Sequence, residues 1–269
     1  MALLRAGNAE AMSSGHDVFM AVTRSIRITM PDRPGALSAV ATALAAHRVD
    51  IVRLDVVSHE GDVVVDDLLL EAESAQAIGG AIGAFWPDVT VRTLDAPFGD
   101  AGVEMGMVIG AVTSAPSPSE ARSRLAAGVA RLMRADRGAV VRLIDTGGFV
   151  PVAGLAATAV VGPRDAFAGR WVLAQQRAAA FPASDGWAPA AFAAEARAAW
   201  VAMAPMGAAD LLVAIRWLNL PFYRGELERL DTLARAVRPV LERGTGSRPG
   251  AVVESLATLP PRAVTLGAA

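Results

Sequence analysis

The chain has 269 residues, which is enough for two ordinary domains with a large buried core. Its 25 basic residues, all of them arginine, nearly balance 27 acidic residues, and the net charge of −2 gives no general reason to bind nucleic acid. The lack of cysteine excludes disulfides, thiolate metal ligands and a cysteine nucleophile, which fits a reducing cytoplasm.

The apolar content of 53% and the mean hydropathy of +0.39 raise the question of a membrane. The most apolar stretches, residues 105–118 and 149–163, are shorter than the roughly 20 apolar residues that a membrane span requires. Both stretches also contain glycine, proline or hydroxyl residues. Residues 1–20 lack the continuous apolar region of a secretory signal. We therefore expect a cytoplasmic protein with no membrane partner.

The first predicted unit, residues 23–96, changes its hydrophobic period in an orderly way. Apolar residues alternate with polar ones in its strands and recur every three or four residues in its helices. The predicted elements are a strand at 26–29, a helix at 37–44, strands at 52–56 and 63–70, a helix at 75–85 and a strand from 89. The order βαββαβ predicts a ferredoxin-like sandwich, so the fold class is α+β.

A second predicted unit, residues 103–243, follows a linker rich in proline and glycine. Its expected elements are helices at 105–112 and 121–132, a hairpin at 139–152, a partly helical stretch at 155–199, strands at 200–205 and 211–217, and a helix at 223–241. Residues 1–22 and 244–269 are expected to be flexible, because they lack such periodicity.

The turn from Asp32 to Leu37 has two interpretations that the sequence leaves open. Asp32 can cap the following helix by accepting a bond from a first-turn N–H, which contributes about 1 kcal/mol. Alternatively, the N–H groups of Gly35, Ala36 and Leu37 lack partners within the helix and favour an anion such as a ligand carboxylate. Gly35 would let that ligand approach the backbone closely. Asp32 or Asp50 would then bind its amino group.

These residues also carry a resemblance to a known family. The strand, the Asp-Arg-Pro-Gly-Ala-Leu turn, the helix and the "RVDI" that opens the next strand resemble an ACT domain over residues 25–95. The resemblance implies that two copies pair side by side and hold an amino acid, or another small effector, near the first strand–helix loop. The ligand-facing residues that it implies are Asp32, Gly35, Ala36, Leu37 and Asp50.

The second unit is similar to a GAF domain. The likeness rests on residues 200–242, in which two strands lead into a long helix with acidic and leucine positions at regular spacing. It implies a central antiparallel sheet flanked by helices. It also implies that this unit dimerises or binds a second ligand.

The remaining residues exclude several chemistries. Only His16, His47 and His59 occur, and none lies in the second unit, which excludes a Ser-His-Asp triad and a histidine haem ligand there. We expect no cofactor, no metal and no catalytic residue. Five arginines between residues 122 and 137 indicate a solvated helix face or a dimer contact, with an anionic partner as the alternative.

The sequence thus predicts a non-catalytic regulatory protein that senses a small molecule, with an amino acid as the favoured ligand. A four-stranded sheet leaves an open edge, so a homodimer is expected. Its output would run through the oligomer or through a protein partner. Two alternatives remain. One is an enzyme with an unrecognised active site in residues 102–243, and the other is an interaction module that dimerises without a ligand.

Overall fold

The computed structural model describes residues 21–94, 99–156, 166–182, 200–216 and 220–242. The predicted flexible tail, 244–269, lies outside these residues, as does the predicted flexible start of the chain except for its last two residues. The first strand already begins at Val22, earlier than the alternation from residue 26 predicted. Most of the stretch expected to be partly helical, 155–199, also lies outside the described residues.

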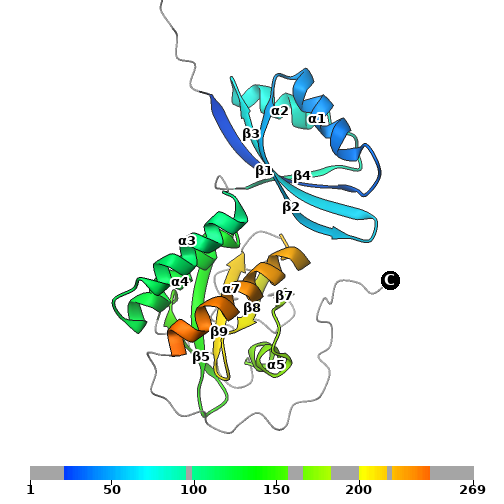
Figure 1. The fold of residues 1–269 in the computed structure, drawn as a ribbon. Helices are drawn as coiled ribbons and strands as arrows, with labels where there is room; N and C mark the ends of the chain where they lie inside the picture. Colours follow the sequence, from blue (N-terminus) through cyan, green and yellow to red (C-terminus); the bar gives the residue numbers. More distant parts are fainter. Residues whose placement is uncertain (1–20, 95–98, 157–165, 183–199, 217–219, 243–269) are drawn as a thin grey trace, which may run out of the picture.

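The first unit has the predicted βαββαβ order, and its four strands form one antiparallel sheet in the order β2-β3-β1-β4 (Figure 1). Its elements are β1 Val22–Pro31, α1 Ala36–Ala46, β2 Asp50–Glu60, β3 Val63–Ala72, α2 Ala75–Gly83 and β4 Thr90–Leu94. Both β1 and β2 pair antiparallel with β3, so these two strands run in the same direction. The first strand–helix loop therefore lies at the same end of the sheet as the β2–β3 turn.

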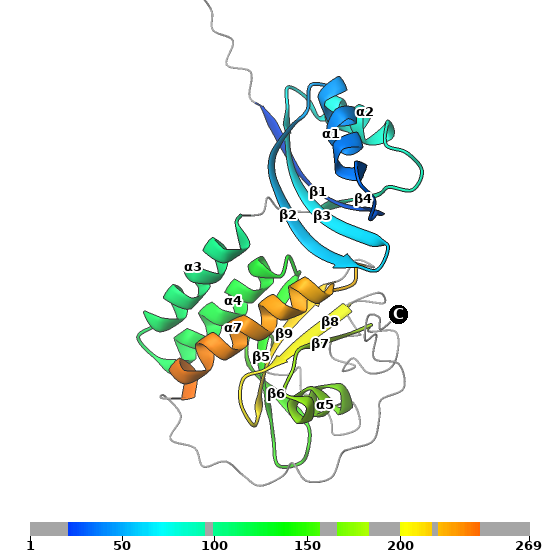
Figure 2. The same cartoon turned by 45° about the vertical axis from the view of Figure 1, so that its right-hand side comes forward.

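Alternation along the central strand β1 divides this sheet into two faces. Ile26 and Ile28 are fully buried in a core with Val40 of α1, so one face packs against the helices. Arg27 lies between them and points to the other face, where Asp67 of β3 is its direct partner in the register. Figure 2 shows the second unit on that other side of the sheet, away from α1 and α2.

The second unit has the predicted central antiparallel sheet flanked by helices. Its elements are α3 Ala101–Thr113, α4 Pro118–Leu132, β5 Arg137–Leu143, β6 Phe149–Ala153, α5 Phe167–Gln175, β7 Ala179–Pro182, β8 Trp200–Pro205, β9 Asp210–Arg216 and α7 Arg224–Glu242. The strand order is β6-β5-β9-β8-β7. The edge strand β7 was not predicted, because its short, alanine-containing sequence carries little strand signal.

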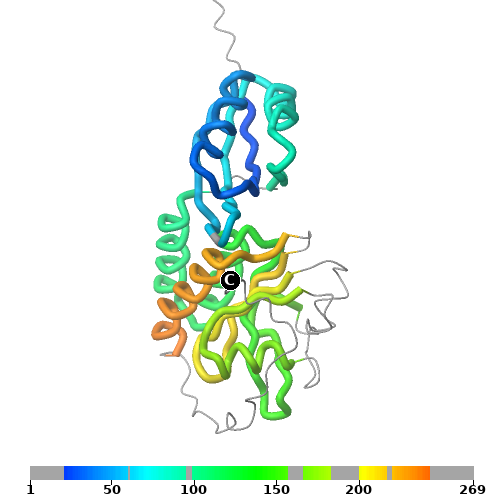
Figure 3. The backbone as a smooth tube through the Cα atoms, turned by 90° about the vertical axis from the view of Figure 1, so that its right-hand side faces the viewer, coloured from blue at the N-terminus to red at the C-terminus, as the bar shows by residue number. Residues whose placement is uncertain are grey.

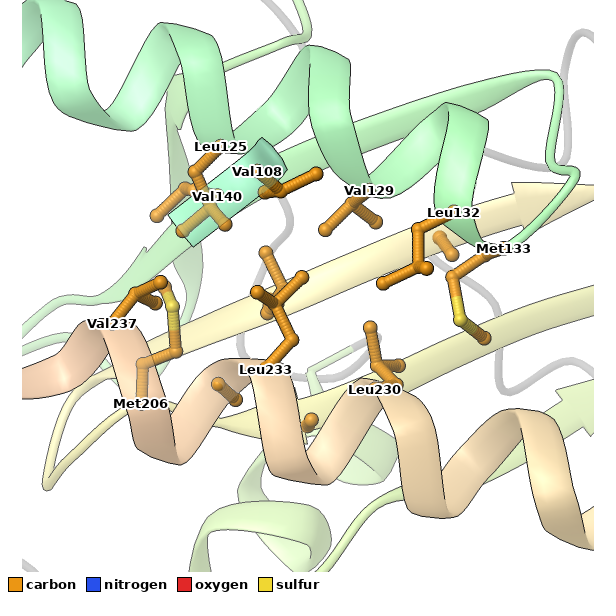
Figure 4. Close-up of a cluster of buried hydrophobic side chains, with 14 of the residues drawn as sticks. Val108, Leu125, Val129, Leu132, Met133, Val140, Met206, Leu230, Leu233 and Val237 are labelled. Carbon is orange, nitrogen blue, oxygen red and sulfur yellow. The ribbon is translucent and has the colours of Figure 1, made fainter. Parts of the chain in front are cut away.

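Helices cover both faces of the second sheet, which gives this unit two apolar cores. The larger core lies between the sheet and α3, α4 and α7, and the smaller one lies under α5. Figure 4 shows the larger core, in which Leu125 and Val129 of α4 face Leu233 and Val237 of α7 across the sheet residue Val140. Figure 3 shows the two units stacked one above the other.

Among the described residues, no helix combines the length and the apolar character needed to cross a membrane. Within the same residues, no group of three or more histidine, aspartate or glutamate side chains is arranged to hold a metal ion.

Candidate functional site

The first candidate site is the loop between β1 and α1, where the predicted ligand residues begin. The chain leaves β1 at Pro31, and the N–H of Asp32 donates to the carbonyl oxygen of Asp62 in the β2–β3 turn at 2.8 Å. Gly35 is the residue that caps the helix, with a φ of 87° that favours glycine. A side chain on Gly35 would meet no atom within 4 Å, so the space beside this backbone is open.

Helix α1 begins without a side-chain cap. Ser74, Asp100 and Ser117 cap the helices α2, α3 and α4 by accepting a bond from a first-turn N–H. At α1 the N–H of Ala36 donates to the carbonyl oxygen of Arg33 at 3.1 Å, the other first-turn N–H groups lack intrahelical partners by geometry, and the positive end of the helix dipole lies there. This end of α1 can therefore accept an anionic group of a ligand.

Of the two interpretations of this turn, the one in which Asp32 caps α1 is wrong. The carboxylate Oδ2 of Asp32 lies 2.5 Å from Nε2 of His59 near the end of β2, and Gly35 takes the cap position instead. The helix starts at Ala36, four residues beyond Asp32, and its cap position is Gly35 in the left-handed conformation, so Asp32 is not the N-cap. Both members of the Asp32–His59 pair are exposed to solvent.

Within one chain, the structure does not bring Asp50 to this loop. Asp50 pairs with Glu71, which in turn pairs with Thr23, whereas Asp32 follows Pro31 at the other end of β1. The eight steps from residue 23 to residue 31 of the strand correspond to about 26 Å. Asp50 instead lines a pocket of about 290 Å³ together with Ala21, Arg48, Glu71, Ala72 and Glu73.

One buried carboxylate lies on the helix-facing side of the sheet, three register positions from the end of β1 that leads into the loop. Asp66 of β3 is 2% exposed and stands opposite Ile28, whose side chain belongs to the core under the helices. Its Oδ1 has no hydrogen-bond partner among the described residues. Burial raises the pKa of Asp66 to about 6, with Asp55 adding to the rise and His59 opposing it.

A second candidate region is the interface between the two units. Arg27 of β1 donates to both carboxylate oxygens of Asp67, at 2.7 and 2.9 Å, and its Nη2 also donates to Glu226 at the start of α7 at 2.9 Å. Arg216 of β9 donates to the same Glu226 oxygen at 2.8 Å. Glu226 thus joins one arginine from each unit, Arg27 and Arg216. These three side chains and that of Asp67 are buried.

The interface continues towards β2 with further ion pairs. Asp55 accepts from Arg134, which follows α4, at 2.9 Å and from Arg229 of α7 at 3.0 Å. Arg134 also contacts Asp67. The first turn of α7 lies directly against the strand, since a side chain on Gly225 would come within 2.3 Å of the Val57 carbonyl oxygen.

The electrostatics of this cluster follow from burial and charge. Burial alone would raise the pKa of Glu226, but Arg216 and Arg27 outweigh it and hold that pKa well below its usual range. Burial lowers the pKa of Arg134 to about 10, and Asp55 opposes that shift. Glu226 and Arg134 are therefore charged at neutral pH, and their ion pairs join the two units.

Sequence reasoning missed this interface. Arg134 belongs to the arginine-rich stretch that was expected on a solvated helix face, and Arg122 of the same stretch is also buried, at 7% exposure. The available signal was the pair Asp66-Asp67 inside a strongly apolar strand, because charged residues are seldom buried without partners.

Comparison with known protein families identifies the family of the first unit. Residues 24–84 match the family model of the ACT domain. The N-terminal unit is an ACT domain. Such domains are regulatory ligand-binding modules, and the β1–α1 loop of this ACT domain is the loop described above. No curated protein matches the chain.

Solved structures with detectable likeness include chains from phytochromes. One is the bacteriophytochrome RpBphP3 from R. palustris, at 10% identity and a TM-score of 0.43, over 69% of this chain and 42% of that one. The chain thus spans less than half the length of that protein. Another is the phycocyanobilin-bound GAF domain of a cyanobacterial phytochrome, at 12% identity and a TM-score of 0.44, over 55% of this chain and 97% of that one.

Proposed function

We propose that this protein is a non-catalytic sensor whose ACT domain binds an amino acid at the β1–α1 loop. The observation that carries the proposal is the uncapped start of α1, with Gly35 in the left-handed conformation and open space beside it. The N–H groups of Gly35 and Leu37 would bind the ligand carboxylate, whereas the N–H of Ala36 already donates to the carbonyl oxygen of Arg33 at 3.1 Å. An ammonium group then needs a carboxylate, a role for which the sequence offers Asp32 or Asp50.

A homodimer gives Asp50 a route to this site. Two β2 edges that pair antiparallel about a two-fold axis bring opposite ends of the strands together. Asp50 of one copy then approaches the loop end of the other copy. Exposed apolar side chains at this edge support such pairing: Val52 is 54% exposed, Leu54 is 37% exposed, and Leu37 of α1 is 37% exposed.

The GAF-like unit is proposed to relay occupancy to a protein partner or to strengthen the dimer. Its docked position on the open face of the ACT sheet supports a relay, because the ion pairs of Arg27 and Glu226 join the strand that precedes the ligand loop to α7. An enzymatic role for residues 102–243 would need a reactive pair of carboxylates in unlike environments. Asp210, a carboxylate of that unit, is instead paired with Arg142 at 2.6 Å.

A thermal-shift screen of the twenty amino acids on the full chain tests the proposal. A ligand that binds only the folded state stabilises it by about 2.7 kcal/mol at a hundredfold excess over Kd, so at least one amino acid should raise the melting temperature. Gly35→Ala should reduce that shift, because the methyl group enters the open space beside the proposed carboxylate position.

Gly61→Ala is the matched control. Gly61 also has a positive φ, of 58°, and open space around it, but it lies in the β2–β3 turn. Both variants should therefore lose a similar amount of intrinsic stability through the left-handed backbone. Only Gly35→Ala should lose the response to the amino acid. An equal response in both variants would place the ligand elsewhere, and no response in the wild type would reject the amino-acid proposal.

A further inference from the structure

The unpartnered carboxylate of Asp66 is the feature that the proposed site leaves unexplained. A buried charged oxygen without a hydrogen bond is costly, and proteins seldom retain one without a function. Asp66 lies on the helix-facing side of β3, two residues inward from Val64, which pairs with Met30 at the end of β1. The loop that carries Gly35 follows directly after this end of β1.

The other carboxylates near the loop already have partners or lie elsewhere. Asp32 is bonded to His59 at 2.5 Å, and Asp50 of the same chain is at the far end of the sheet. Asp67, next in sequence to Asp66, points to the opposite face and is held by Arg27. Among the described carboxylates at this end of the sheet, Asp66 is the one with a buried oxygen that still lacks a bond.

We propose that Asp66 holds the ammonium group of the amino-acid ligand whose carboxylate binds at the start of α1. This assignment rests on the proposed function and names the cation-binding residue within it. A cationic group would supply both the hydrogen bond and the opposite charge that Asp66 lacks, whereas a neutral donor would supply only the hydrogen bond and an anionic group would repel it. Two charged groups of β2 act on Asp66 without bonding to it: His59 is bonded to Asp32, and Asp55 stands opposite Asp67 and so lies on the other face of the sheet.

Because Asp66 is buried, the ammonium group of the ligand must extend below the surface to contact it. An ammonium group on a side chain extends deeper than the α-ammonium group, so both sources are to be compared. Glycine and alanine carry only the α-ammonium, lysine and ornithine carry a second one, and acetate and propionate carry none. We expect the wild-type protein to be stabilised by glycine and alanine or by lysine and ornithine, and not by acetate or propionate.

The test measures ligand affinity by calorimetry on the full chain with Asp66→Asn, Asp62→Asn and Asp50→Asn. Asp66→Asn should weaken binding at least tenfold while the chain stays folded, because it removes the charge and keeps the shape. Asp62→Asn is the control, since it removes a carboxylate from the neighbouring turn, where only the Asp62 carbonyl oxygen bonds to the loop. Its affinity should equal that of the wild type.

Proton release gives a second readout that a purely structural role would not produce. At pH 6 an ammonium group that binds Asp66 displaces part of its bound proton, so the binding heat should depend on the ionisation enthalpy of the buffer. That dependence should disappear in Asp66→Asn.

Each remaining outcome counts against the assignment. Equal affinity in Asp66→Asn and the wild type overturns the role of Asp66 but leaves the amino-acid site standing. Loss of binding in Asp50→Asn, with binding retained in Asp66→Asn, assigns the ammonium to Asp50 at a dimer interface. Absence of binding by any ammonium-bearing probe rejects both the assignment and the proposed function.

Discussion

At the scale of single residues, Asp66 is expected to weaken the protein in the absence of a ligand. Its pKa is about 6 in the folded chain and 3.8 in the unfolded chain, so the unfolded state holds its negative charge more readily. The difference corresponds to about 3 kcal/mol of lost stability above pH 7, as an upper limit. The loss shrinks as the pH falls through 6 towards 3.8. Asp66→Asn should therefore stabilise the chain at pH 7.5 and do so less at pH 4.5.

Chemical denaturation of both proteins at the two pH values measures this effect. The comparison between variant and wild type cancels the titration of all other groups that the substitution leaves unchanged. A variant that is less stable than the wild type at pH 7.5 would mean that Asp66 makes a favourable contact in solution, and its assignment as an unpaired carboxylate would then be wrong.

At the scale of elements, the periodic segments were predictable and the local geometry of the loop was not. Alternation in residues 26–29 and the three-to-four spacing in residues 37–44 and 223–241 depend only on burial of one face, which the sequence encodes directly. The start of α1 was not predictable, because Gly35 adopts a left-handed conformation that displaced Asp32 from the cap position. β7 forms by pairing with β8, a non-local contact.

The edge strand β2 carries a prediction about assembly. If two copies pair at this edge, Val52→Arg should convert a dimer into a monomer at micromolar concentration, because it places a charge in an apolar contact. Val103→Arg on α3 is the matched control, since Val103 is similarly exposed, at 62%, on a different unit. Light scattering of the wild type, Val52→Arg and Val103→Arg measures the oligomeric state of each protein. A monomeric wild type would contradict the dimer, and a monomeric Val103→Arg would move the interface to α3.

At the scale of the whole molecule, the interface between the units lay beyond sequence reasoning. Strand periodicity shows that Arg27 and Asp67 point away from the helices, but it does not show what covers that face. Glu226, which accepts from Arg27, is 199 residues away from it along the chain. Because of these ion pairs, the central strands of the ACT sheet have neighbours on both faces. One face supports the proposed ligand loop, and the other is bound to α7.

This sharing predicts that Glu226 couples the stability of the two units. Glu226→Gln leaves Arg27 and Arg216 buried with less compensating charge, and loss of one partner in a buried ion pair costs about 3 kcal/mol or more. Glu228→Gln is the matched control, because Glu228 forms an exposed pair with Arg224 in the same helix and should cost below about 0.5 kcal/mol. Denaturant unfolding should show one transition in the wild type and in Glu228→Gln.

In Glu226→Gln the units should separate into two transitions, since fewer ion pairs remain to hold them together. The pKa of Glu226 is lowered in the folded chain, so its contribution is fully present above the unfolded pKa of 4.5 and is lost as the pH falls through the folded value. The stability difference between wild type and Glu226→Gln should accordingly shrink in acid. A single transition in Glu226→Gln, with a cost equal to that of Glu228→Gln, would mean that the units are held together by contacts other than this network.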